Sequence, residues 1–513
     1  MNIMILLEMA AQAAPDRIAI GSLDGGLTYS QLFERAGSLA TALRQRAADE
    51  GTDQGAQQGA QQATSQHLLY TDVSTPTLPV ALFGAAWAGQ VFVPVNYRLA
   101  DDRLRTLIAK QAPALCINSV DGATRIGAIE GIHPITTQEI AALTNNTTMA
   151  ETDWSFEGED VAIHLHTSGT SGEPKVAILR QRHLVSYVLG SVEFLGADED
   201  EATLVSVPPY HIAGMSAILT ATYGGRRLVQ LPAFEPTVWV NAARTEHITH
   251  AMVVPTMLAR ILEVLEATGD TLPHLRHLSY GGGRMPIPVI EHALRLLPHV
   301  TFVNAYGLTE TSSSITILDG DDHRLAVSSS DHAVRARLGS VGRALPTVEL
   351  SIRDALGTEV ESPGRGEVWV RGEQVSGEYG GVSVLDDEGW FATKDAGWID
   401  SDGYLFLEGR MDDVIVRGGE NLSPGEIEDV LLQHPAIHDA TVVGLPDTDW
   451  GEVVAAVVVL HEGAILDEDG VRAWVTTHLR SSRTPTQVVF RTELPYSETG
   501  KILRRVLKAE LTS

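Results

Sequence analysis

Hydrophobic residues in the first 310 positions follow two alternating periodicities. Short apolar runs such as Val161–Leu165 and Val300–Val303 are typical of buried strands, whereas Met257–Ala267 and Ile287–Leu297 show the spacing of amphipathic helices. This alternation predicts α/β layering around parallel sheets. Further predicted strands are Val91–Val95, Thr203–Val207 and Ala251–Val254, and further predicted helices are Tyr29–Arg44 and Leu78–Ala88.

The pattern changes near residue 340, where glycines, turns and short β-like runs dominate. Examples are Glu349–Arg353, Gly366–Arg371 and Gly403–Leu407, which predict a small β-rich subdomain. A polar joint at 409–413 follows. Beyond it, Ser423-Pro424-Gly425-Glu426 has the form of a capping box with proline at the first helical position. The last unit is predicted to contain strands near Ala440–Val443 and Val453–Leu460 and a helix near Glu468–Leu479.

These patterns predict a large α/β N-terminal domain and a small α+β C-terminal domain on a hinge. The large domain would combine parallel-sheet layers with the β-rich subdomain over residues 1–408. The hinge would be 409–412, and the mobile C-terminal domain would be 413–513. Residues 47–66 are rich in Gln, Ala, Gly and acidic residues, so we expect a flexible surface insertion there.

Composition narrows the classes of partner. The chain has 513 residues, is 44% hydrophobic, and carries a formal net charge of −29, which gives no general attraction to nucleic acid or anionic lipid. Cys116 is the single cysteine, so no internal disulfide can form. The start of the chain is a poor signal peptide. The longest apolar run in the whole sequence, Val453–Leu460, is too short to span a bilayer. We therefore expect a cytoplasmic protein without a membrane span.

The stretch His166–Lys175 reads His-Thr-Ser-Gly-Thr-Ser-Gly-Glu-Pro-Lys. Its glycines allow a backbone to approach an anion, its hydroxyls donate hydrogen bonds, and Lys175 adds a positive charge. The spacing differs from that of the Gly-x-x-x-x-Gly-Lys-Ser/Thr nucleotide loop. Taken alone, a solvated surface turn is the favoured interpretation, with a polyphosphate loop as the alternative.

Two glycine-containing segments follow apolar strands. In Asn304–Thr311, Tyr306 can offer a stacking face, Thr309 a phosphate donor, and Glu310 a carboxylate for Mg²⁺. In Tyr280–Pro286, the glycines Gly281, Gly282 and Gly283 leave room for a flat ring or an acyl chain. Structural turns or loops are about as consistent with either segment alone.

Two further positions carry charges of interest. Asp395 lies in a predicted turn within Trp390–Gly397, where a carboxylate can accept hydrogen bonds from ribose hydroxyls. Lys501 follows Gly500 near the C-terminus and precedes a helix-like run. Taken alone, Asp395 would be interpreted as an ordinary turn aspartate and Lys501 as a solvated lysine.

In combination, order and spacing, these segments resemble the adenylate-forming superfamily of acyl-CoA synthetases, peptide-synthetase adenylation domains and luciferases. The resemblance covers nearly the whole chain. It implies an acyl-CoA synthetase that joins a carboxylate to the α-phosphate of ATP and then passes the acyl group to a thiol. Both half-reactions would use one site, with the C-terminal domain rotating between them.

The resemblance also implies roles for individual residues. The loop would hold the β- and γ-phosphates, Asp395 and Arg410 would bind the ribose, and Asp412 would be the hinge residue. Lys501 resembles the lysine that bridges carboxylate and α-phosphate, a role that supplies charge and alignment. The residues implied to bind ATP or AMP are Thr167, Ser168, Gly169, Thr170, Ser171, Gly172, Lys175, Gly281, Gly282, Gly283, Asn304, Ala305, Tyr306, Asp395 and Arg410, with Thr309 on the phosphate and Glu310 near Mg²⁺.

Coenzyme A is the implied thiol acceptor. Arg417, Gly418, Gly419 and Glu420 resemble the segment that lines the tunnel for the pantetheine arm. The implied acyl pocket comprises Tyr210, His211, Gly214, Met215, Gly307 and Leu308. His211 would gate this pocket or contact the carboxylate. An ordinary wall histidine is the alternative.

The lining indicates the class of acid. The stretch 210–215 contains no acidic residue, and no carrier-protein domain follows residue 513; both features disfavour an amino-acid-activating peptide-synthetase module. A neutral, apolar lining favours an uncharged, bulky carboxylic acid. Arg284 would pair with a second carboxylate in a diacid ligase, although a structural arginine is the favoured interpretation.

The loop also departs from the family pattern. Val176 stands where glycine is usual, and Arg180 stands where relatives commonly show threonine. A β-branched residue restricts the backbone. One alternative is therefore an enzyme impaired in adenylation that mainly converts a supplied acyl-adenylate, for instance from a partner ligase, into a thioester. An acyl-AMP ligase that loads a carrier protein, a luciferase-like oxygenase and a non-catalytic AMP-binding module are also consistent with the motifs.

Overall fold

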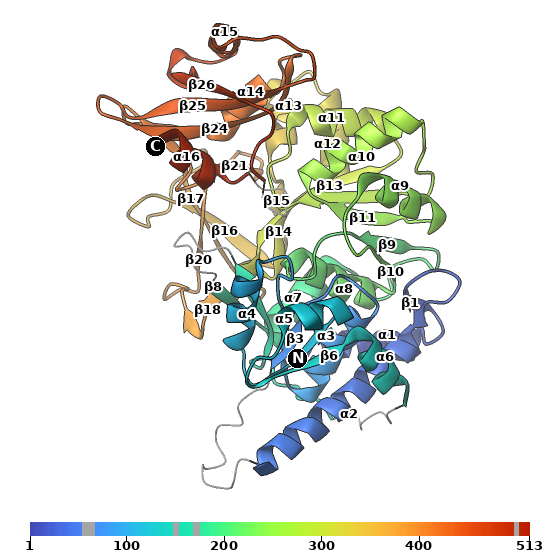
Figure 1. Ribbon diagram of the computed structural model, residues 1–513. Coiled ribbons are helices and arrows are strands. Elements are labelled where there is room, and N and C mark those ends of the chain that lie inside the picture. Colours follow the sequence, from blue (N-terminus) through green and yellow to red (C-terminus); the bar gives the residue numbers. More distant parts are fainter. Residues whose placement is uncertain (54–66, 147–152, 168–174, 497–501, 513) are drawn as a thin grey trace.

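A largely parallel nine-stranded sheet forms the centre of the larger part of the protein. In the computed structural model, which describes residues 1–53, 67–146, 153–167, 175–496 and 502–512, its strand order is β15-β14-β13-β12-β11-β9-β10-β1-β2 (Figure 1). The strands from β13 to β1 run parallel, and β14, β15 and β2 are antiparallel to their neighbours. The strand bounds are β1 Ile18–Ile20, β2 Leu27–Thr28, β9 Ala202–Val205, β10 Arg227–Gln230, β11 His250–Val253, β12 His277–Gly281, β13 Thr301–Leu308, β14 Ser313–Leu318 and β15 Arg343–Ala344.

The second large sheet has eight strands in the order β19-β18-β8-β7-β4-β3-β5-β6. Strands β3 to β7 are parallel, whereas β8, β18 and β19 are antiparallel additions at one edge. The bounds are β3 His67–Tyr70, β4 Val91–Pro94, β5 Ala114–Asn118, β6 Ile132–Thr136, β7 Val161–Thr167, β8 Lys175–Arg180, β18 Glu378–Tyr379 and β19 Val382–Ser383.

Helices connect the parallel strands and cover the two sheets (Figure 1). Helix α3 shows why, because every residue from Leu78 to Trp87 is buried, as expected of a helix that is apolar on all sides. One hydrophobic cluster joins α3 to α1, α2 and α8. The helix bounds are α1 Met4–Ala13, α2 Tyr29–Asp53, α3 Thr77–Ala88, α4 Asp101–Ala109, α5 Val120–Ile126, α6 Thr137–Asn146, α7 Gln181–Ser191, α8 Ile212–Gly224, α9 Pro236–Thr245, α10 Pro255–Thr268, α11 Ile287–Leu296, α12 Gly320–Ser328 and α13 His332–Ala336.

The predicted change of character after residue 340 corresponds to two smaller sheets. The first is a four-stranded antiparallel sheet of β16 Val348–Arg353, β17 Gly366–Gly372, β20 Phe391–Ile399 and β21 Leu405–Arg410. The second contains β22 Ile415–Arg417, β23 Glu420–Leu422, β24 Ile437–Asp447, β25 Gly451–Leu460 and β26 Gln487–Arg491, and it packs with α14 Pro424–Leu431, α15 Glu468–His478 and α16 Arg504–Thr512.

The C-terminal unit has hydrophobic clusters of its own. Both clusters around its sheet contain only residues between Ile415 and Leu511. The layered α/β architecture with a smaller α+β C-terminal unit confirms the predicted fold class. Both long strands of this unit extend beyond their predicted bounds, since β24 runs from Ile437 to Asp447 and β25 begins at Gly451.

Three local predictions are corrected by the structure. Helix α2 continues to Asp53, so residues 47–53 are helical rather than part of an insertion, and residues 54–66 lie outside the described chain. The Ser423 side chain does not cap α14 but donates to the Glu408 carbonyl, although Pro424 does occupy the first helical position. Segments 304–308 and 391–397 belong to strands rather than turns, because β13 is paired with β12 and β14 and β20 is paired with β17 and β21.

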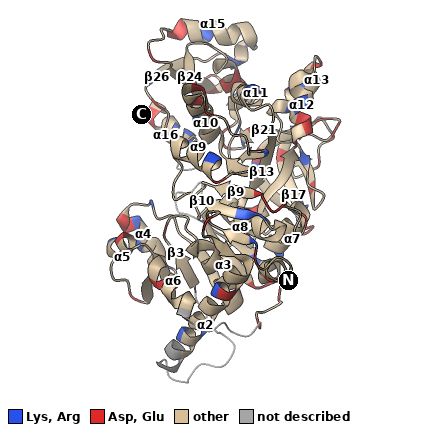
Figure 2. Cartoon of the chain, turned by 90° about the vertical axis from the view of Figure 1, so that its right-hand side faces the viewer, with Lys and Arg blue, Asp and Glu red and all other residues tan. Residues whose placement is uncertain are grey.

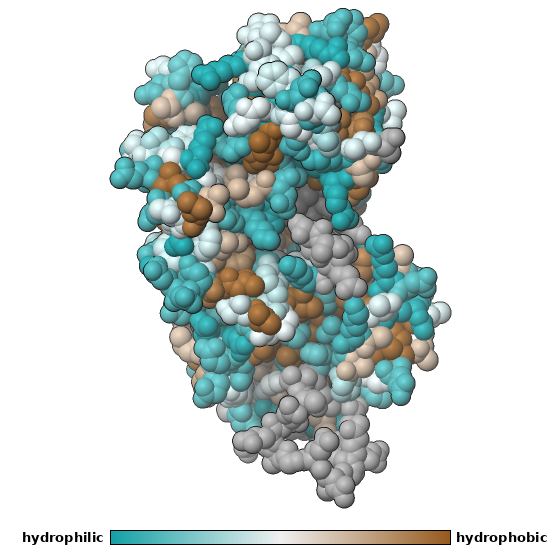
Figure 3. All heavy atoms as spheres, turned by 90° about the vertical axis from the view of Figure 1, so that its left-hand side faces the viewer, coloured by the Kyte–Doolittle hydropathy of each residue, from teal (hydrophilic) through white to brown (hydrophobic). Residues whose placement is uncertain are grey.

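The surface agrees with the acidic composition. Segments coloured for acidic residues occur along outer elements in both halves of the cartoon in Figure 2. On the face drawn in Figure 3, apolar residues occur as separate patches among hydrophilic ones. Among the described residues, none of the helices is long and apolar enough to cross a membrane.

Candidate active site

The candidate site begins at the carboxyl edge of the nine-stranded sheet. Gly281 ends β12, and its neighbour β13 runs on from Asn304 to Leu308. In open parallel sheets, ligands bind beyond the carboxyl ends of the strands. The two glycine-containing segments singled out in the sequence are therefore adjacent, with Gly281 opposite Ala305 in the register of the sheet.

Tyr306, Asp395 and Arg410 form one hydrogen-bonded group. The Tyr306 hydroxyl donates to Oδ2 of Asp395 at 2.6 Å, and Nη1 of Arg410 donates to Oδ1 at 3.0 Å. Arg410 lies opposite Asp395 on the neighbouring strand β21. Burial, followed by the charge of Asp395, raises the pKa of Tyr306 well above its usual value, so the hydroxyl stays a donor.

This group fits a ribose. Each Asp395 oxygen receives one of these bonds and retains a second lone pair, so the carboxylate can still accept sugar hydroxyls. The adjacent glycines pack closely within the protein. A Cβ added at Gly281 would lie 2.2 Å from the Ala305 carbonyl oxygen, and one at Gly282 would be in van der Waals contact with Val254 at 3.6 Å. A flat base can lie against bare backbone of this kind, so the donor set and the glycine wall suit a nucleotide.

The turn that carries Thr309 and Glu310 is held from a distant segment. It is a short 3-10 helix, Thr309–Thr311, followed by Ser312 and Ser313 with positive φ of 57° and 132°. Such backbone is strained for residues other than glycine. The fully buried Gln374 fixes it, since its Nε2 donates to the carbonyls of Thr311 at 3.0 Å and Ser314 at 2.8 Å.

Close packing explains the glycine in this segment. A Cβ at Gly307 would lie 1.8 Å from the Ser313 carbonyl oxygen, so any larger residue would push the turn away from β13. The amide and the hydroxyl of Ser376 both point to the Glu310 carbonyl, at 2.8 and 3.2 Å. The Tyr379 hydroxyl donates to Oε1 of Glu310, whose side chain is buried.

Gln374, Ser376 and Tyr379 were not identified from the sequence. They lie more than 60 residues from the turn they support, and no local motif marks them. A single carboxylate such as that of Glu310 is the kind of protein ligand that Mg²⁺ uses together with phosphates. Groups of three or more His, Cys, Asp or Glu that could hold a metal unaided do not occur in the described part of the chain.

Both described ends of the predicted phosphate loop lie in a hairpin. Thr167 ends β7, Lys175 begins β8, and the two residues are paired. The Lys175 ammonium lies 5.3 Å from the centre of the Tyr379 ring. The residues between them, including Ser168, Gly169, Thr170, Ser171 and Gly172, lie outside the described chain, as does Lys501.

Val176 occupies a regular strand position. It pairs with His166, and its carbonyl accepts a hydrogen bond from Gly380 N–H at 3.0 Å. Extended, paired backbone suits β-branched residues. The local backbone therefore does not require glycine at this position. Val176 is thus no longer a physical reason to expect impaired adenylation, although adenylation itself stays untested.

The predicted acyl-pocket residues begin helix α8. His211 occupies its N-cap position, and the buried Gly214 and Met215 lie in its first turn. The rings of Tyr210 and His211 are 4.7 Å apart, and Tyr97 contacts Tyr210 edge to face at 5.7 Å. Ser313 donates to Ser216 at 3.2 Å, so this helix and the Glu310 turn are in contact.

The predicted coenzyme A segment is a tight turn between β22 and β23. Gly418 and Gly419 both have positive φ, 58° and 81°, as a type I′ hairpin turn requires. Gly418 N–H donates to the Trp450 carbonyl at 2.8 Å, and Trp450 is 54% exposed beside it. Arg417 lies 5.6 Å from that indole, and Glu420 pairs with Arg483.

Two further residues connect the large part of the protein to the C-terminal unit. Arg284, which follows the glycine wall, donates to Oδ2 of Asp429 on α14. This pairing agrees with a structural arginine rather than a receptor for a second carboxylate. Asp412 lies exposed in the turn after β21, where Asp413 N–H donates back to the Arg410 carbonyl at 2.9 Å.

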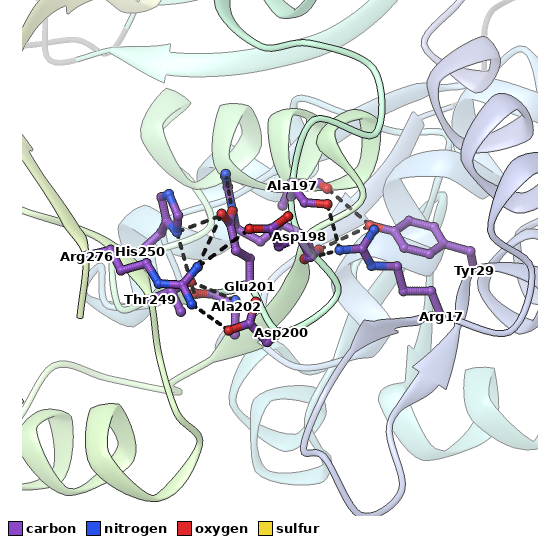
Figure 4. Close-up of polar contacts among 12 residues, drawn as sticks. Arg17, Tyr29, Ala197, Asp198, Asp200, Glu201, Ala202, Thr249, His250 and Arg276 are labelled. Atoms are coloured by element: carbon purple, nitrogen blue, oxygen red, sulfur yellow. Dashed lines mark hydrogen bonds and ion pairs between the residues drawn. The ribbon is translucent and has the colours of Figure 1, made fainter. Parts of the chain in front are cut away.

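A second charged network lies at the opposite, amino edge of the nine-stranded sheet (Figure 4). Glu201 accepts from Nε of Arg226 at 2.9 Å and lies 3.7 Å from Nδ1 of His250. Arg276 donates to Asp200 at 2.6 Å. Burial lowers the pKa of His250 to about 2, with repulsion from Arg226 as the next cause.

Comparison with known proteins identifies the family. A model of AMP-binding enzymes matches residues 7–380, and a model of the AMP-binding enzyme C-terminal domain matches residues 426–501. A feruloyl-CoA synthase from an Amycolatopsis species is 30% identical over 503 residues, covering 96% of this chain and 96% of the relative.

Solved structures agree over the whole chain. ATP-bound MatB from Rhodopseudomonas palustris superimposes with a TM-score of 0.84 at 26% identity, covering 100% of this chain and 99% of that one. An o-succinylbenzoate CoA synthetase from Bacillus subtilis, in complex with its acyl-adenylate intermediate, gives 0.81 at 26% identity, covering 98% and 97%. The chain therefore belongs to the AMP-binding enzyme family, the adenylate-forming superfamily that its motifs resemble.

Proposed function

We propose that the protein is an acid–CoA ligase. In the first half-reaction, a carboxylate oxygen bonds to the α-phosphorus of Mg-ATP and pyrophosphate leaves. In the second, the sulfur of coenzyme A bonds to the acyl carbon, AMP leaves, and the thiol loses its proton. The observation that carries this proposal is the Tyr306–Asp395–Arg410 group beside the glycine wall, which suits a nucleoside.

The proposed roles rest on the positions of the described residues and, for residues 168–174 and Lys501, on the family motifs alone. Asp395 and Arg410 hold the ribose, and the wall from Gly281 to Gly283 and Ala305 encloses adenine beside Tyr306. The Asn304 amide donates to the Ser340 carbonyl at 3.0 Å, so this residue fixes the wall rather than offering that hydrogen to the base. Thr309 and the loop 167–175 bind phosphates, Glu310 contacts Mg²⁺, and Lys501 bridges the carboxylate and α-phosphate.

We further propose domain boundaries at the hinge 409–412, with the units 1–408 and 413–513 on either side. Support comes from the separate hydrophobic clusters beyond Ile415 and from the second family model, which starts at residue 426. In this arrangement Asp412 is the hinge residue, and the turn Arg417–Glu420 lines the route of the pantetheine arm. Gly419 has open space beside it, since a Cβ there would meet no atom within 4 Å, whereas Gly418 packs against the Trp450 ring.

An aromatic acid is the favoured substrate class. The rings of Tyr97, Tyr210 and His211 lie together at the start of α8, and aromatic groups pack well against such faces. Feruloyl-CoA synthase and o-succinylbenzoate CoA synthetase, two of the proteins similar to this chain, are named for aromatic acids. Arg284 is already paired with Asp429, which favours an acid without a second carboxylate near the glycine wall.

A split assay tests the function. One arm supplies Mg-ATP with members of an acid panel (aryl-propenoic, aryl-acetic, medium-chain and dicarboxylic) and measures pyrophosphate. The other supplies synthetic acyl-AMP and coenzyme A and measures thioester. We expect both arms to proceed, most rapidly with an aromatic acid. Nucleotide binding without turnover in either arm would contradict the proposal and indicate a non-catalytic module.

Three further outcomes would each identify a different activity. Thioester formation from acyl-AMP without pyrophosphate release for any acid would indicate an enzyme impaired in adenylation. Adenylation followed by transfer to the phosphopantetheine thiol of an acyl carrier protein, but not to coenzyme A, would indicate an acyl-AMP ligase. Light emission on addition of oxygen would indicate a luciferase-like reaction.

A further inference from the structure

Tyr379 lies between two residues that the proposed function assigns to ATP. Its hydroxyl donates to Oε1 of Glu310, and its ring faces the Lys175 ammonium at 5.3 Å. Glu310 and Lys175 are far apart in the sequence, and no motif includes Tyr379. The tyrosine therefore joins the proposed cation-contacting carboxylate to the end of the proposed phosphate loop.

The hydrogen bond fixes the direction in which the Glu310 side chain points. The Tyr379 hydroxyl is the donor and Oε1 of the carboxylate is the acceptor. One lone pair of Oε1 is occupied in this way, which fixes the rotation of a group whose other lone pairs stay available.

Tyr379 is attached to the loop strand by backbone pairing. Strand β18 runs beside β8 (Figure 1), with Tyr379 opposite Ala177. Gly380 N–H donates to the Val176 carbonyl at 3.0 Å. The strand that leaves the phosphate loop and the segment that contacts Glu310 are therefore held together at the first residues after Lys175.

An ion pair next to Tyr379 strengthens this attachment. Nε of Arg180 donates to Oε2 of Glu378 at 2.9 Å, and Nη2 donates to Oε1 at 2.8 Å. A bidentate pair fixes angle as well as distance. The Glu378 side chain is only 11% exposed, so the pair is poorly screened by solvent. Arg180 also occupies the position at which members of the family commonly have threonine.

We propose that Tyr379 is a positioning residue for Glu310 in the ATP-dependent half-reaction, and that the Arg180–Glu378 pair holds Tyr379 in place. The proposal rests on the function proposed above and deepens it. Catalysis by alignment is sensitive to small displacements of the aligned groups. The second half-reaction contains no pyrophosphate and does not need this alignment.

Tyr379→Phe is the first test, because it keeps the ring beside Lys175 and removes only the hydroxyl. Calorimetric titration without acid would measure ATP affinity with Mg²⁺ and AMP affinity without it. We expect the Kd of Mg-ATP to rise about tenfold, as for loss of a hydrogen bond to a charged group, with the Kd of AMP within about twofold. The rate with acyl-AMP and coenzyme A should also stay within about twofold.

The matched control is Tyr404→Phe. Tyr404 donates to Oδ1 of Asp322 at 2.6 Å, which is the same kind of bond away from the proposed phosphate site. This variant should leave both nucleotide affinities unchanged. Equal weakening of Mg-ATP and AMP binding by Tyr379→Phe would overturn the proposal, because it would indicate a general structural role. Unchanged Mg-ATP binding would overturn it as well.

A charge exchange tests the ion pair. Glu378→Arg should weaken Mg-ATP binding about threefold to tenfold, as expected for a displaced hydrogen-bond donor, and adding Arg180→Glu should restore most of that affinity. Failure of the double variant to recover, despite an unchanged melting temperature, would overturn the role assigned to the pair. This test remains available if Tyr379→Phe does not fold.

Failure of the proposed function gives a different result. If wild-type protein binds Mg-ATP but releases no pyrophosphate with any acid, the acid–CoA ligase assignment fails, while the binding comparison still decides the role of Tyr379. If ATP affinity of the wild type is independent of Mg²⁺, the positioning role itself is overturned, whatever the acid panel shows.

Discussion

The two edges of the nine-stranded sheet carry charged networks of opposite character. At the amino edge, Glu201 is paired with Arg226 and lies within 3.7 Å of His250. At the carboxyl edge, Asp395 receives one hydrogen bond on each oxygen, and the Arg410 side chain is 48% exposed. In the first network Glu201 is within 3.7 Å of two arginines, Arg226 and Arg276, whereas in the second Asp395 has one arginine and one phenol as partners.

The contrast shows that perturbed pKa values alone do not locate a site. The pKa of His250 is lowered to about 2, and that of Tyr306 is raised, so both edges hold groups far from their usual values. Structural ion-pair networks perturb pKa values as active sites do. What distinguishes the carboxyl edge is its place in the fold, because open parallel sheets bind ligands beyond the carboxyl ends of their strands and Gly281 and Ala305 lie there side by side.

The largest effect is expected when Lys501, the cation proposed to contact the α-phosphate, is removed. Lys501→Ala should lower acid-dependent pyrophosphate release roughly 10²–10³-fold, as for other electrostatic groups of this kind. Acyl-AMP and coenzyme A should still react at nearly the wild-type rate. Lys508→Ala is the control, since Lys508 pairs with Glu452 at 2.8 Å. An equal fall in both half-reactions would show the assigned role to be wrong.

The second effect tests whether Asp395 differs from an ordinary paired carboxylate. Asp395→Asn should raise the Kd of AMP about 10–100-fold, because hydrogen bonds to a charged acceptor are lost. Asp322→Asn is a matched control, since Asp322 also accepts from a tyrosine, Tyr404, and lies 3.6 Å from Arg343. Calorimetry with AMP measures both. A similar rise in the Kd of AMP for both variants would show that Asp395 does not differ from an ordinary paired carboxylate.

The third effect concerns stability at the amino edge. Glu201→Ala leaves the Arg226 guanidinium, 19% exposed, without its carboxylate partner. We expect a loss of roughly 1–3 kcal/mol in unfolding free energy and unchanged kcat/KM at a temperature where the protein is folded. Differential scanning calorimetry and the pyrophosphate assay measure the two quantities. A variant with normal stability and reduced activity would reverse the assignment of the edges.

The smallest effect is a change in the slope of stability with pH. Because His250 has a folded pKa of about 2, it stays neutral in the folded protein while the unfolded chain takes up a proton below about pH 6.5. Its contribution to stability is therefore complete above that pH. As pH falls, it is lost at about 1.4 kcal/mol per pH unit.

Melting temperatures between pH 7.5 and pH 5 would test this contribution. His250→Asn should show a shallower decline than the wild type. His183 is also buried, and burial is the main cause that lowers its pKa to about 3. It therefore also lowers stability as pH falls, and it does so equally in the variant and the wild type. Identical slopes for the variant and the wild type would mean that His250 is not the neutral buried group described here.

Much of the site could be predicted because its parts are local motifs. The glycines at 281–283, the run Asn304–Glu310, Asp395 and Arg410 are each recognisable in a few residues, and the parallel strands place the first two together. Apolar runs likewise predicted β4, β7, β9, β11 and β13 within a few residues, whereas β8 and β10 were not predicted. The family models agree with the resemblance that these motifs carry.

The parts that were missed depend on contacts over long sequence distances. Gln374 and Tyr379 support the Glu310 turn from a segment of ordinary composition, and only the folded chain shows those hydrogen bonds. Asp395 was expected in a turn, but pairing with β21 makes it part of a strand. Ser423 has the sequence of a helix cap, but the nearby Glu408 carbonyl takes its hydroxyl.

The separate hydrophobic clusters of the C-terminal unit have a consequence for how the protein unfolds. No buried member of those clusters precedes Ile415, so melting of that unit need not expose the apolar interior of the remainder. Cooperativity in unfolding follows shared apolar contacts. A calorimetric trace should therefore contain more than one transition, and a substitution inside one unit should displace its own peak while the other keeps its temperature.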